Sequence, residues 1–340
     1  MRQLAIIFCC LFLSACDLVL PKPEVVTLKG ITMGTSYTIK AVDVPEGVTP
    51  EALYQKVYDD LDAVNTEFSN WKPESAVVQF NERRNTDWIS VSKHFEAVFE
   101  SASELHTLSG GRFDITVAPL IDLWGFGPSD QMREPNQEEL ETALKSVGMT
   151  KHIEFDAAAQ RLRKISPEVS MNFSAIAKGY GADVIANTLN QIGVENYMVE
   201  IGGDLIVKGV NASGNPWRVA IEKPLDDGRA IELVLDLTDL AMASSGDYRN
   251  FYVKDGQRLS HIIDPVTGRP VTHNLASVTV VSENAMNADG LATALLVLGE
   301  KRGMEIAEMF NISAYFIQRT EDGFVQSYSS SFERFLKPTN

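Results

Sequence analysis

Residues 197–235 decide the fold class, and they read YMVEIGGDLIVKGVNASGNPWRVAIEKPLDDGRAIELVL. β-Branched and other apolar residues gather in short runs at 197–200, 205–210, 217–222 and 231–235. Gly, Asn, Pro and Asp, which favour turns, separate these runs. Short strands that follow one another without a regular alternation with helices do not build a parallel sheet of βαβ units. The stretch therefore favours an α+β fold.

Helical and further strand patterns lie on both sides of this stretch. Thr49-Pro50-Glu51 is typical of a helix start with Pro at the first helical position, and apolar residues recur at helical spacing after it. The other predicted helices span 92–108, 174–192 and 284–298. Strand composition is also present at 276–281 and at 25–42, where it is interrupted at 32–35.

The N-terminus is typical of a secreted bacterial lipoprotein. Arg2 precedes an apolar run from Leu4 to Leu13, which is shorter than the roughly 20 residues that a membrane-spanning helix needs. Cys16 follows Leu13-Ser14-Ala15, and this pattern resembles the lipobox, in which the Cys becomes the lipidated first residue of the mature chain. Asp17 resembles the signal that retains such proteins in the inner membrane. A secreted protein with an incidental Cys is the alternative.

This reading predicts a signal peptide at 1–15, a lipidated Cys and tether at 16–24, and one domain at 25–340. All 3 cysteines of the chain (Cys9, Cys10 and Cys16) lie within the first 16 residues, so the mature domain has neither a disulfide nor a thiolate metal site. The formal net charge of −16 argues against nucleic acid and against basic docking onto anionic lipid. Acyl chains on Cys16 would hold the protein at the membrane.

Familiar catalytic motifs are missing from the sequence. It contains no Walker A motif, no His-Glu-x-x-His, no Gly-x-Ser-x-Gly and no Gly-x-Gly-x-x-Gly. Its 5 histidines show no ligand-like clustering, which argues against a zinc site. The chemistry must then come from hydroxyls, carboxylates, backbone amides and at most a single His.

Two glycine-containing segments are candidates for anion binding. In Ser109-Gly-Gly-Arg-Phe-Asp114, backbone N–H groups and Arg112 could contact a phosphate, and Phe113 offers a ring face. A helix C-cap with a salt bridge is the alternative. In 172–183 a loop enters a helix, and free N–H groups there could face a phosphate near Ser174 and Lys178. Close helix packing through small residues explains the same pattern.

Two further segments carry polar side chains suited to catalysis. His261 precedes the tight turn Asp264-Pro265 to Gly268, although a single His is more often structural. Asp289 and Thr293 lie one helical turn apart near a helix start, and their hard oxygen atoms suit Mg²⁺. Without other evidence, an Asp near a helix N-terminus is more often a dipole or cap partner. If it were exposed, it would contribute only about 0.3–1 kcal/mol to stability.

Taken in order, these segments resemble the ApbE family of FAD:protein FMN transferases. The resemblance covers essentially the whole mature chain, and the following blocks carry it: 33–35, 110–114, 177–180, 202–204, 245–248, 261–268 and 289–293. It implies a two-lobed, T-fold-like α+β domain with FAD bound in a central cleft.

Residue by residue, the resemblance also implies a site. The residues expected around the flavin nucleotide are Met33, Trp71, Arg112, Phe113, Asp114, Ser174, Tyr180 and Ile263. Trp71 and Tyr180 are expected to stack on its rings. Magnesium is expected at Asp289, Thr293 and the backbone carbonyl of Ala177.

The implied reaction moves FMN from FAD to a Thr or Ser hydroxyl of an acceptor protein and releases AMP. His261 is the expected base, with Asp289 as the alternative. The resemblance suggests membrane redox acceptors, such as flavin-carrying subunits of sodium-pumping quinone reductases and related electron-transport complexes. The chain would then be lipid-anchored to the inner membrane and face the periplasm. Two other functions remain open, a pyrophosphatase that splits FAD into FMN and AMP, and a non-catalytic flavin-binding lipoprotein.

Overall fold

The structure, a computed structural model, describes residues 23–127, 132–254 and 256–336. The expected signal peptide, Cys16 and the tether as far as residue 22 lie outside these ranges. Within them, no helix combines the length and the apolar character needed to cross a bilayer.

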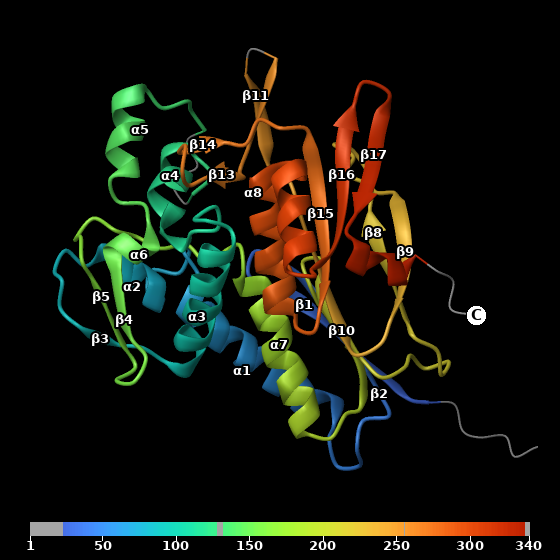
Figure 1. Cartoon of the computed structure of the whole chain (residues 1–340). Helices are drawn as coiled ribbons and strands as arrows, with labels where there is room; N and C mark the ends of the chain where they lie inside the picture. Colours follow the sequence, from blue (N-terminus) through green and yellow to red (C-terminus); the bar gives the residue numbers. More distant parts are fainter. Residues whose placement is uncertain (1–22, 128–131, 255, 337–340) are drawn as a thin grey trace, which may run out of the picture.

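A large antiparallel sheet of eight strands forms one half of the molecule (Figure 1). Its strand order is β1-β2-β6-β7-β10-β15-β16-β17. The strands are β1 (Val25–Thr32), β2 (Thr35–Val42), β6 (Asn196–Ile201), β7 (Asp204–Lys208), β10 (Leu240–Gly246), β15 (Leu275–Ser282), β16 (Ser313–Thr320) and β17 (Gly323–Tyr328). The expected break at 32–35 is the turn between β1 and β2.

Both faces of this sheet are covered. Helices α7 (Ala177–Gln191) and α8 (Ala285–Met309) pack on one face, α7 over β6 and β7 and α8 over β10 and β15. On the other face lie the hairpin of β8 (Trp217–Glu222) and β9 (Ile231–Leu237) and the short helix η2 (Ser330–Phe335). Because β15 is covered on both sides, almost every one of its residues is buried, and its sequence reads as an apolar run instead of an alternating one.

The other half is a mainly helical lobe (Figure 1). Its elements are α1 (Pro50–Phe68), α2 (Ala76–Glu82), α3 (Lys93–Leu108), η1 (Ile115–Val117), α4 (Ala118–Leu123), α5 (Gln137–Leu144), α6 (Met149–His152) and a sheet of β3 (Ile89–Ser90), β5 (Arg161–Lys164) and β4 (Ile153–Asp156). The rings of Phe68, Phe95 and Phe173 pack together in its core. Two small hairpins, β11 (Phe251–Lys254) with β12 (Gln257–Ser260) and β13 (Ile263–Asp264) with β14 (Arg269–Pro270), complete the fold.

The expected two-lobed α+β architecture is therefore confirmed, with changes at two helix ends. The helix expected from Ser174 begins at Ala177, so Ser174 lies in the preceding loop. The helix expected to end at Leu298 continues to Met309, but its backbone is kinked at Gly299, where φ is 76°. The sequence pattern therefore marked the break and not the end of α8.

Candidate functional site

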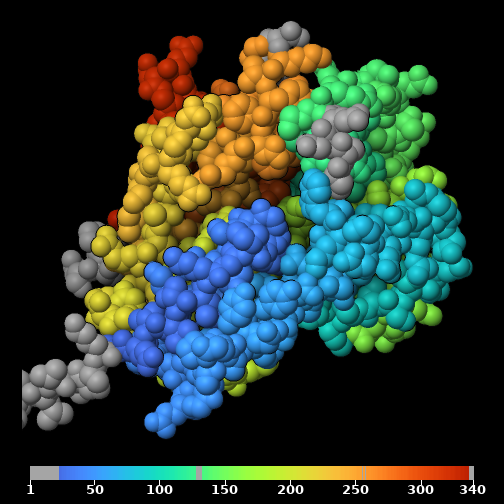
Figure 2. Space-filling view, turned by 180° about the vertical axis from the view of Figure 1, so that it is seen from behind, coloured from blue at the N-terminus to red at the C-terminus, as the bar shows by residue number. Residues whose placement is uncertain are grey.

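A cavity of about 1360 Å³ opens between the two halves of the molecule. In the space-filling view it is the hollow between the blue N-terminal elements and the yellow and orange elements (Figure 2). Its wall includes almost all of the residues expected at the site: Met33, Trp71, Arg112, Phe113, Asp114, Ser174, Ala177, His261, Ile263, Asp289 and Thr293. The structure thus brings together residues that are far apart in the sequence.

The inner wall is the corner at which the first turns of α7 and α8 meet. The backbone N–H of Gly179 donates a hydrogen bond of 3.1 Å to the Asp289 carboxylate. A Cβ at Gly179 would lie 2.2 Å from the carbonyl oxygen of Ala285 and 2.9 Å from Cβ of Asp289, so only glycine permits this approach. The expected close packing through small residues is confirmed, and it also places Asp289 at the N-terminus of α7.

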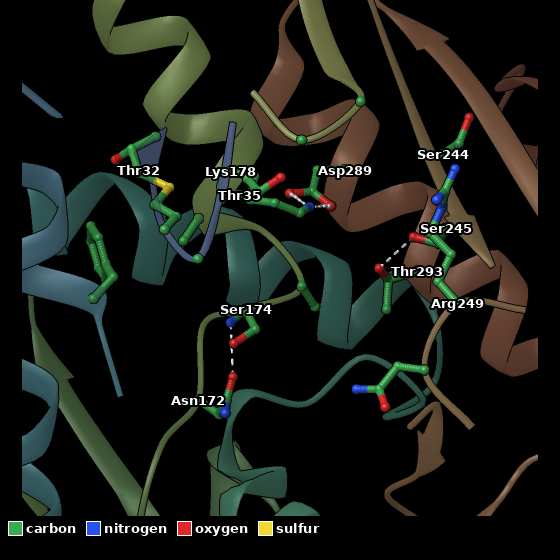
Figure 3. Close-up of a pocket in the computed structure, with 18 of the residues that line it drawn as sticks. Thr32, Thr35, Asn172, Ser174, Lys178, Ser244, Ser245, Arg249, Asp289 and Thr293 are labelled. Atoms are coloured by element: carbon green, nitrogen blue, oxygen red, sulfur yellow. Dashed lines mark hydrogen bonds and ion pairs between the residues drawn. The ribbon is translucent and has the colours of Figure 1, made fainter. Parts of the chain in front are cut away.

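Lys178 lies between two buried carboxylates at this corner, and Figure 3 shows its contact with one of them, Asp289. Its Nζ is 2.5 Å from Asp204 and 3.3 Å from both oxygens of Asp289. Burial alone would lower the pKa of Lys178, but Asp204 and Asp289 raise it, so the ammonium stays charged. Burial raises the pKa of Asp204 to about 7, and repulsion from Asp289 contributes. The single positive charge of Lys178 is therefore shared between the carboxylates of Asp204 and Asp289.

Thr293 faces the cavity one helical turn after Asp289, and its hydroxyl is 2.8 Å from the hydroxyl of Ser245 on β10 (Figure 3). The residues present fit a magnesium ion, since a carboxylate, a hydroxyl and the backbone of Ala177 offer hard oxygen donors on one wall. Among the described residues, no group of three or more His, Cys, Asp or Glu could hold a metal. The expected magnesium ligands include a single carboxylate and so do not form such a group.

Asp289 differs in one respect from the expectation. It is 2 % exposed and is hydrogen bonded to the first turn of another helix, so it is not an exposed helix-terminal carboxylate. Its contribution to stability should therefore exceed that of a surface dipole interaction.

An ion pair fixes the loop after β10. Arg319 on β16 donates two hydrogen bonds, of 2.8 and 2.6 Å, to the buried carboxylate of Asp247. This pair holds the segment that carries Ser245 and Arg249, both of which line the cavity. Bidentate Arg–carboxylate pairs are geometrically specific, so Arg319 orients this wall without lining the cavity.

The His261 imidazole is suited to accept a proton. Its Nδ1 is 2.9 Å from the carbonyl oxygen of Asn250. A carbonyl oxygen only accepts hydrogen bonds, so we assign the proton to Nδ1, which leaves the lone pair of Nε2 free. Burial lowers the pKa of His261, so the ring is neutral at pH 7.

The segment 109–114 ends helix α3, and its second half forms part of the cavity wall. Gly110 and Gly111 have positive φ and end α3, with the N–H of Gly111 bonded to the carbonyl of His106 at 2.8 Å. Arg112 forms a salt bridge with Asp264, which ties this segment to the turn after His261. The predicted cap and salt bridge are confirmed. Arg112, Phe113 and Asp114 line the cavity, whereas the N–H groups of Gly110 and Gly111 are used in the cap and do not face a phosphate there.

Three of the residues expected around the flavin are held by structural contacts. The buried Asp114 carboxylate accepts hydrogen bonds from the N–H groups of Thr116 and Met149, so it anchors its own loop. Phe113 is largely buried in the core of the helical lobe. Ser174 precedes α7, and its N–H bonds the side chain of Asn172 at 2.8 Å (Figure 3).

Tyr180, which is expected to stack on the flavin rings, lies beside the cavity in a contact with the helical lobe. Tyr180 is described but is not part of the cavity wall. Its ring packs against Phe68, and its hydroxyl is 2.7 Å from Nδ1 of His94. On α7 it follows Lys178 by two positions and so points to another side of the helix. Trp71, in contrast, lines the cavity and is largely exposed.

Sequence reasoning assigned no role to Asp204, Ser245 or Arg319. Asp204 and Ser245 lie in two of the motif blocks, 202–204 and 245–248. These blocks are the sequence signal that could have pointed to both residues. Arg319 lies in a strand without any local motif. Its pairing with Asp247 depends on the sheet, because the two residues are 72 positions apart in the chain.

The chain is similar to known flavin transferases along almost its whole length. The model of the ApbE family matches residues 33–316. A FAD:protein FMN transferase of Vibrio cholerae is 43% identical over 328 residues, which cover 96% of both chains, and that of Haemophilus influenzae is 41% identical and covers 96% of this chain and 95% of its own. The solved flavin transferase ApbE from Vibrio cholerae superimposes with a TM-score of 0.84 at 42% identity, covering 92% of this chain and 99% of the other. The apo flavinyl transferase ApbE of Pseudomonas stutzeri gives 0.84 at 35% identity, covering 92% and 97%.

Proposed function

The chain belongs to the ApbE family, and from this premise we propose that it transfers the FMN part of FAD to a Thr or Ser hydroxyl of an acceptor protein and releases AMP in a magnesium-dependent reaction. One observation carries the proposal: Asp289 and Thr293 share the cavity wall with the charged Lys178, at the point where two helix N-termini meet. The N-terminus of α7 opens onto this wall at Ala177 and Lys178 and favours a bound phosphate group.

The proposed site holds the dinucleotide along the cavity. Met33, Trp71 and Ile263 provide apolar contacts for the flavin, and Trp71 can stack on it. Arg112, held by Asp264, lies on the same wall and can donate to a phosphate. Asp289, Thr293 and the carbonyl of Ala177 would hold Mg²⁺, which when bound neutralises charge on the phosphate oxygens.

The chain's own residues then have to move one proton. The acceptor oxygen forms a bond to the phosphorus on the riboflavin side, and the bond from that phosphorus to the bridging oxygen breaks. The bonding electrons leave with AMP. We assign the hydroxyl proton to Nε2 of His261, because this nitrogen has a free lone pair and the imidazole is neutral at pH 7. Asp289 is the second candidate base, but its carboxylate already contacts Lys178 and Gly179.

We further propose that Cys16 is lipidated and holds the protein at the periplasmic face of the inner membrane. The support is the sequence pattern around Cys16, which lies outside the described residues. Membrane redox proteins, such as flavin-carrying subunits of sodium-pumping quinone reductases, are the proposed acceptors. Tethering to the same membrane would raise their effective concentration at the enzyme.

One assay tests the proposal against its rivals. The protein is incubated with FAD, Mg²⁺ and a purified flavin-carrying subunit of a sodium-pumping quinone reductase. We expect fluorescent flavin bound covalently to the acceptor after denaturing electrophoresis, with an equal amount of AMP released. Free FMN in place of acceptor-bound flavin would favour a pyrophosphatase. Absence of AMP under all conditions would favour a flavin-binding protein without catalysis.

A further inference from the structure

The cavity is larger than a small-molecule substrate requires. Pockets for small ligands are commonly about 300–1000 Å³, whereas this one is about 1360 Å³. It also continues beyond the proposed metal and base positions, to the end of β1 and along α1. The cavity therefore extends past the proposed reaction centre, and its outer part can face a second substrate.

Exposed apolar side chains border this outer part of the cavity. Ile31 at the end of β1 is 79% exposed, and Tyr54 and Tyr58 on α1 are 44% and 53% exposed. All three line the cavity. We call the two tyrosines, Tyr54 and Tyr58, the aromatic rim. In the space-filling view, the blue β1–β2 hairpin and the lighter blue α1 lie beside the hollow (Figure 2).

The aromatic rim is not required by the fold. The buried face of α1 consists of Leu53, Val57, Leu61, Val64 and Phe68. Tyr54 and Tyr58 are one turn apart on the neighbouring face, so their rings form a continuous strip next to the cavity. Exposed aromatic residues that adjoin a site are typical of surfaces that bind a macromolecule, because Tyr gains much contact area at a low entropic cost.

We propose that the aromatic rim docks the acceptor protein, by packing against apolar side chains that flank its reactive hydroxyl. This inference rests on the proposed function and adds the surface that recognises the second substrate. The rim is continuous with the catalytic cavity, so a segment bound there can place a hydroxyl inside it. An apolar contact also suits a protein with a net charge of −16, because it does not depend on the charge of the acceptor.

The test compares the double variant Tyr54→Gln/Tyr58→Gln with the control Tyr328→Gln. Tyr328 on β17 is also 44% exposed, but β17 is at the opposite edge of the sheet from β1. Both variants remove exposed rings and should fold, which circular dichroism and thermal unfolding would verify. The acceptor is the purified flavin-carrying subunit of a sodium-pumping quinone reductase, and FAD binding is followed by fluorescence titration in the presence of Mg²⁺.

We expect the double variant to raise KM for the acceptor by about tenfold or more, since truncation of central interface aromatics commonly has such an effect. The Kd for FAD and the kcat at saturating acceptor should stay within about twofold of wild type, and the control should match wild type throughout. An unchanged KM would overturn the docking proposal and leave the transferase proposal intact. A matching loss of FAD affinity would assign the rim to the nucleotide site instead. Absence of transfer by wild type would refute the proposed function, and the docking proposal with it.

Discussion

Among single residues, Asp289 contacts more of the site than any other expected ligand, since it links α7, Lys178 and the proposed metal position. Its carboxylate accepts a hydrogen bond from Gly179, contacts Lys178 and lies one turn before Thr293. A buried carboxylate with an ammonium on one side and a proposed metal on the other contributes both to stability and to binding. These two contributions can be separated by experiment.

We expect Asp289→Asn to remove transferase activity and to lower the free energy of unfolding by about 1–3 kcal/mol, because the amide still accepts from Gly179 but no longer pairs with Lys178. In thermal unfolding, Mg²⁺ should stabilise the wild type and leave the variant unchanged. The exposed Asp322→Asn is the control and should respond to Mg²⁺ like wild type. Equal stabilisation of all three proteins by Mg²⁺ would place the metal elsewhere.

His261 gives a prediction about pH. Its pKa is lowered by burial, so the imidazole becomes protonated only below its ordinary value of about 6.5. As the pH falls through the lowered pKa, the base is lost and kcat should decrease, whereas above pH 6.5 this group should leave kcat constant. His261→Asn should reduce kcat by about 10²–10⁴-fold, abolish this acidic limb and preserve FAD affinity. A variant with weakened FAD binding but normal kcat would identify His261 as a positioning residue and favour Asp289 as the base.

At the scale of elements, the site depends on how closely α7 and α8 approach. The contact is made by Gly179 against the first residue of α8, Ala285, and it is reinforced by Asp183, whose carboxylate accepts hydrogen bonds of 2.8 Å from the N–H groups of Ala285 and Met286. The first N–H groups of α8 are thus satisfied within the protein, which fixes α8 against α7. The N-terminus of α7, at Ala177 and Lys178, lies on the cavity wall and favours a bound anion.

Gly179→Ala should separate the two helices. The added Cβ would meet backbone atoms that cannot rotate away, and overpacking of this kind typically costs about 1–3 kcal/mol. We expect a lower unfolding temperature together with weaker FAD binding. Asn187→Ala, at an exposed position on the same helix, is the matched control and should leave both unchanged. Normal FAD affinity in a destabilised Gly179→Ala protein would show that the spacing of α7 and α8 does not set the nucleotide site.

At the scale of the whole molecule, the cavity exists because two separately packed halves meet. The helical lobe has its own core around Phe95 and Phe173, and the large sheet has cores on both of its faces. Loops and helix ends from both halves supply the polar side chains, so the site can be complete only in the folded domain.

The proposed anchor acts on this assembled domain as a unit. Cys16→Ser should yield protein that lacks the lipid and is released from membranes by washing with buffer, since an acyl anchor and not surface charge is proposed to hold it. Activity on a solubilised acceptor should equal that of wild type, as residue 16 precedes the domain. Fractionation with immunoblotting and the flavin transfer assay would measure the two effects. Firm membrane attachment of the variant would exclude the lipobox interpretation.

The sequence by itself determined most of the elements and the membership of the site. Caps and periodicity located α1 and α3, and alternating turn residues located the strands of 197–235, because these signals are local. All of the expected site residues except Tyr180 line the cavity, and of these only Trp71 and Ser174 lie outside the motif blocks.

Only the tertiary structure decided how these residues act. It turned Tyr180 away from the cavity, buried Asp289, and paired Asp247 with Arg319 across the sheet. It also revealed the aromatic rim, since the helical spacing of α1 predicts its buried face but not what lies beside its exposed one. The physical reason is that burial, pairing and orientation depend on contacts between segments that are distant in the sequence, whereas caps, turns and periodicity depend on neighbours along the chain.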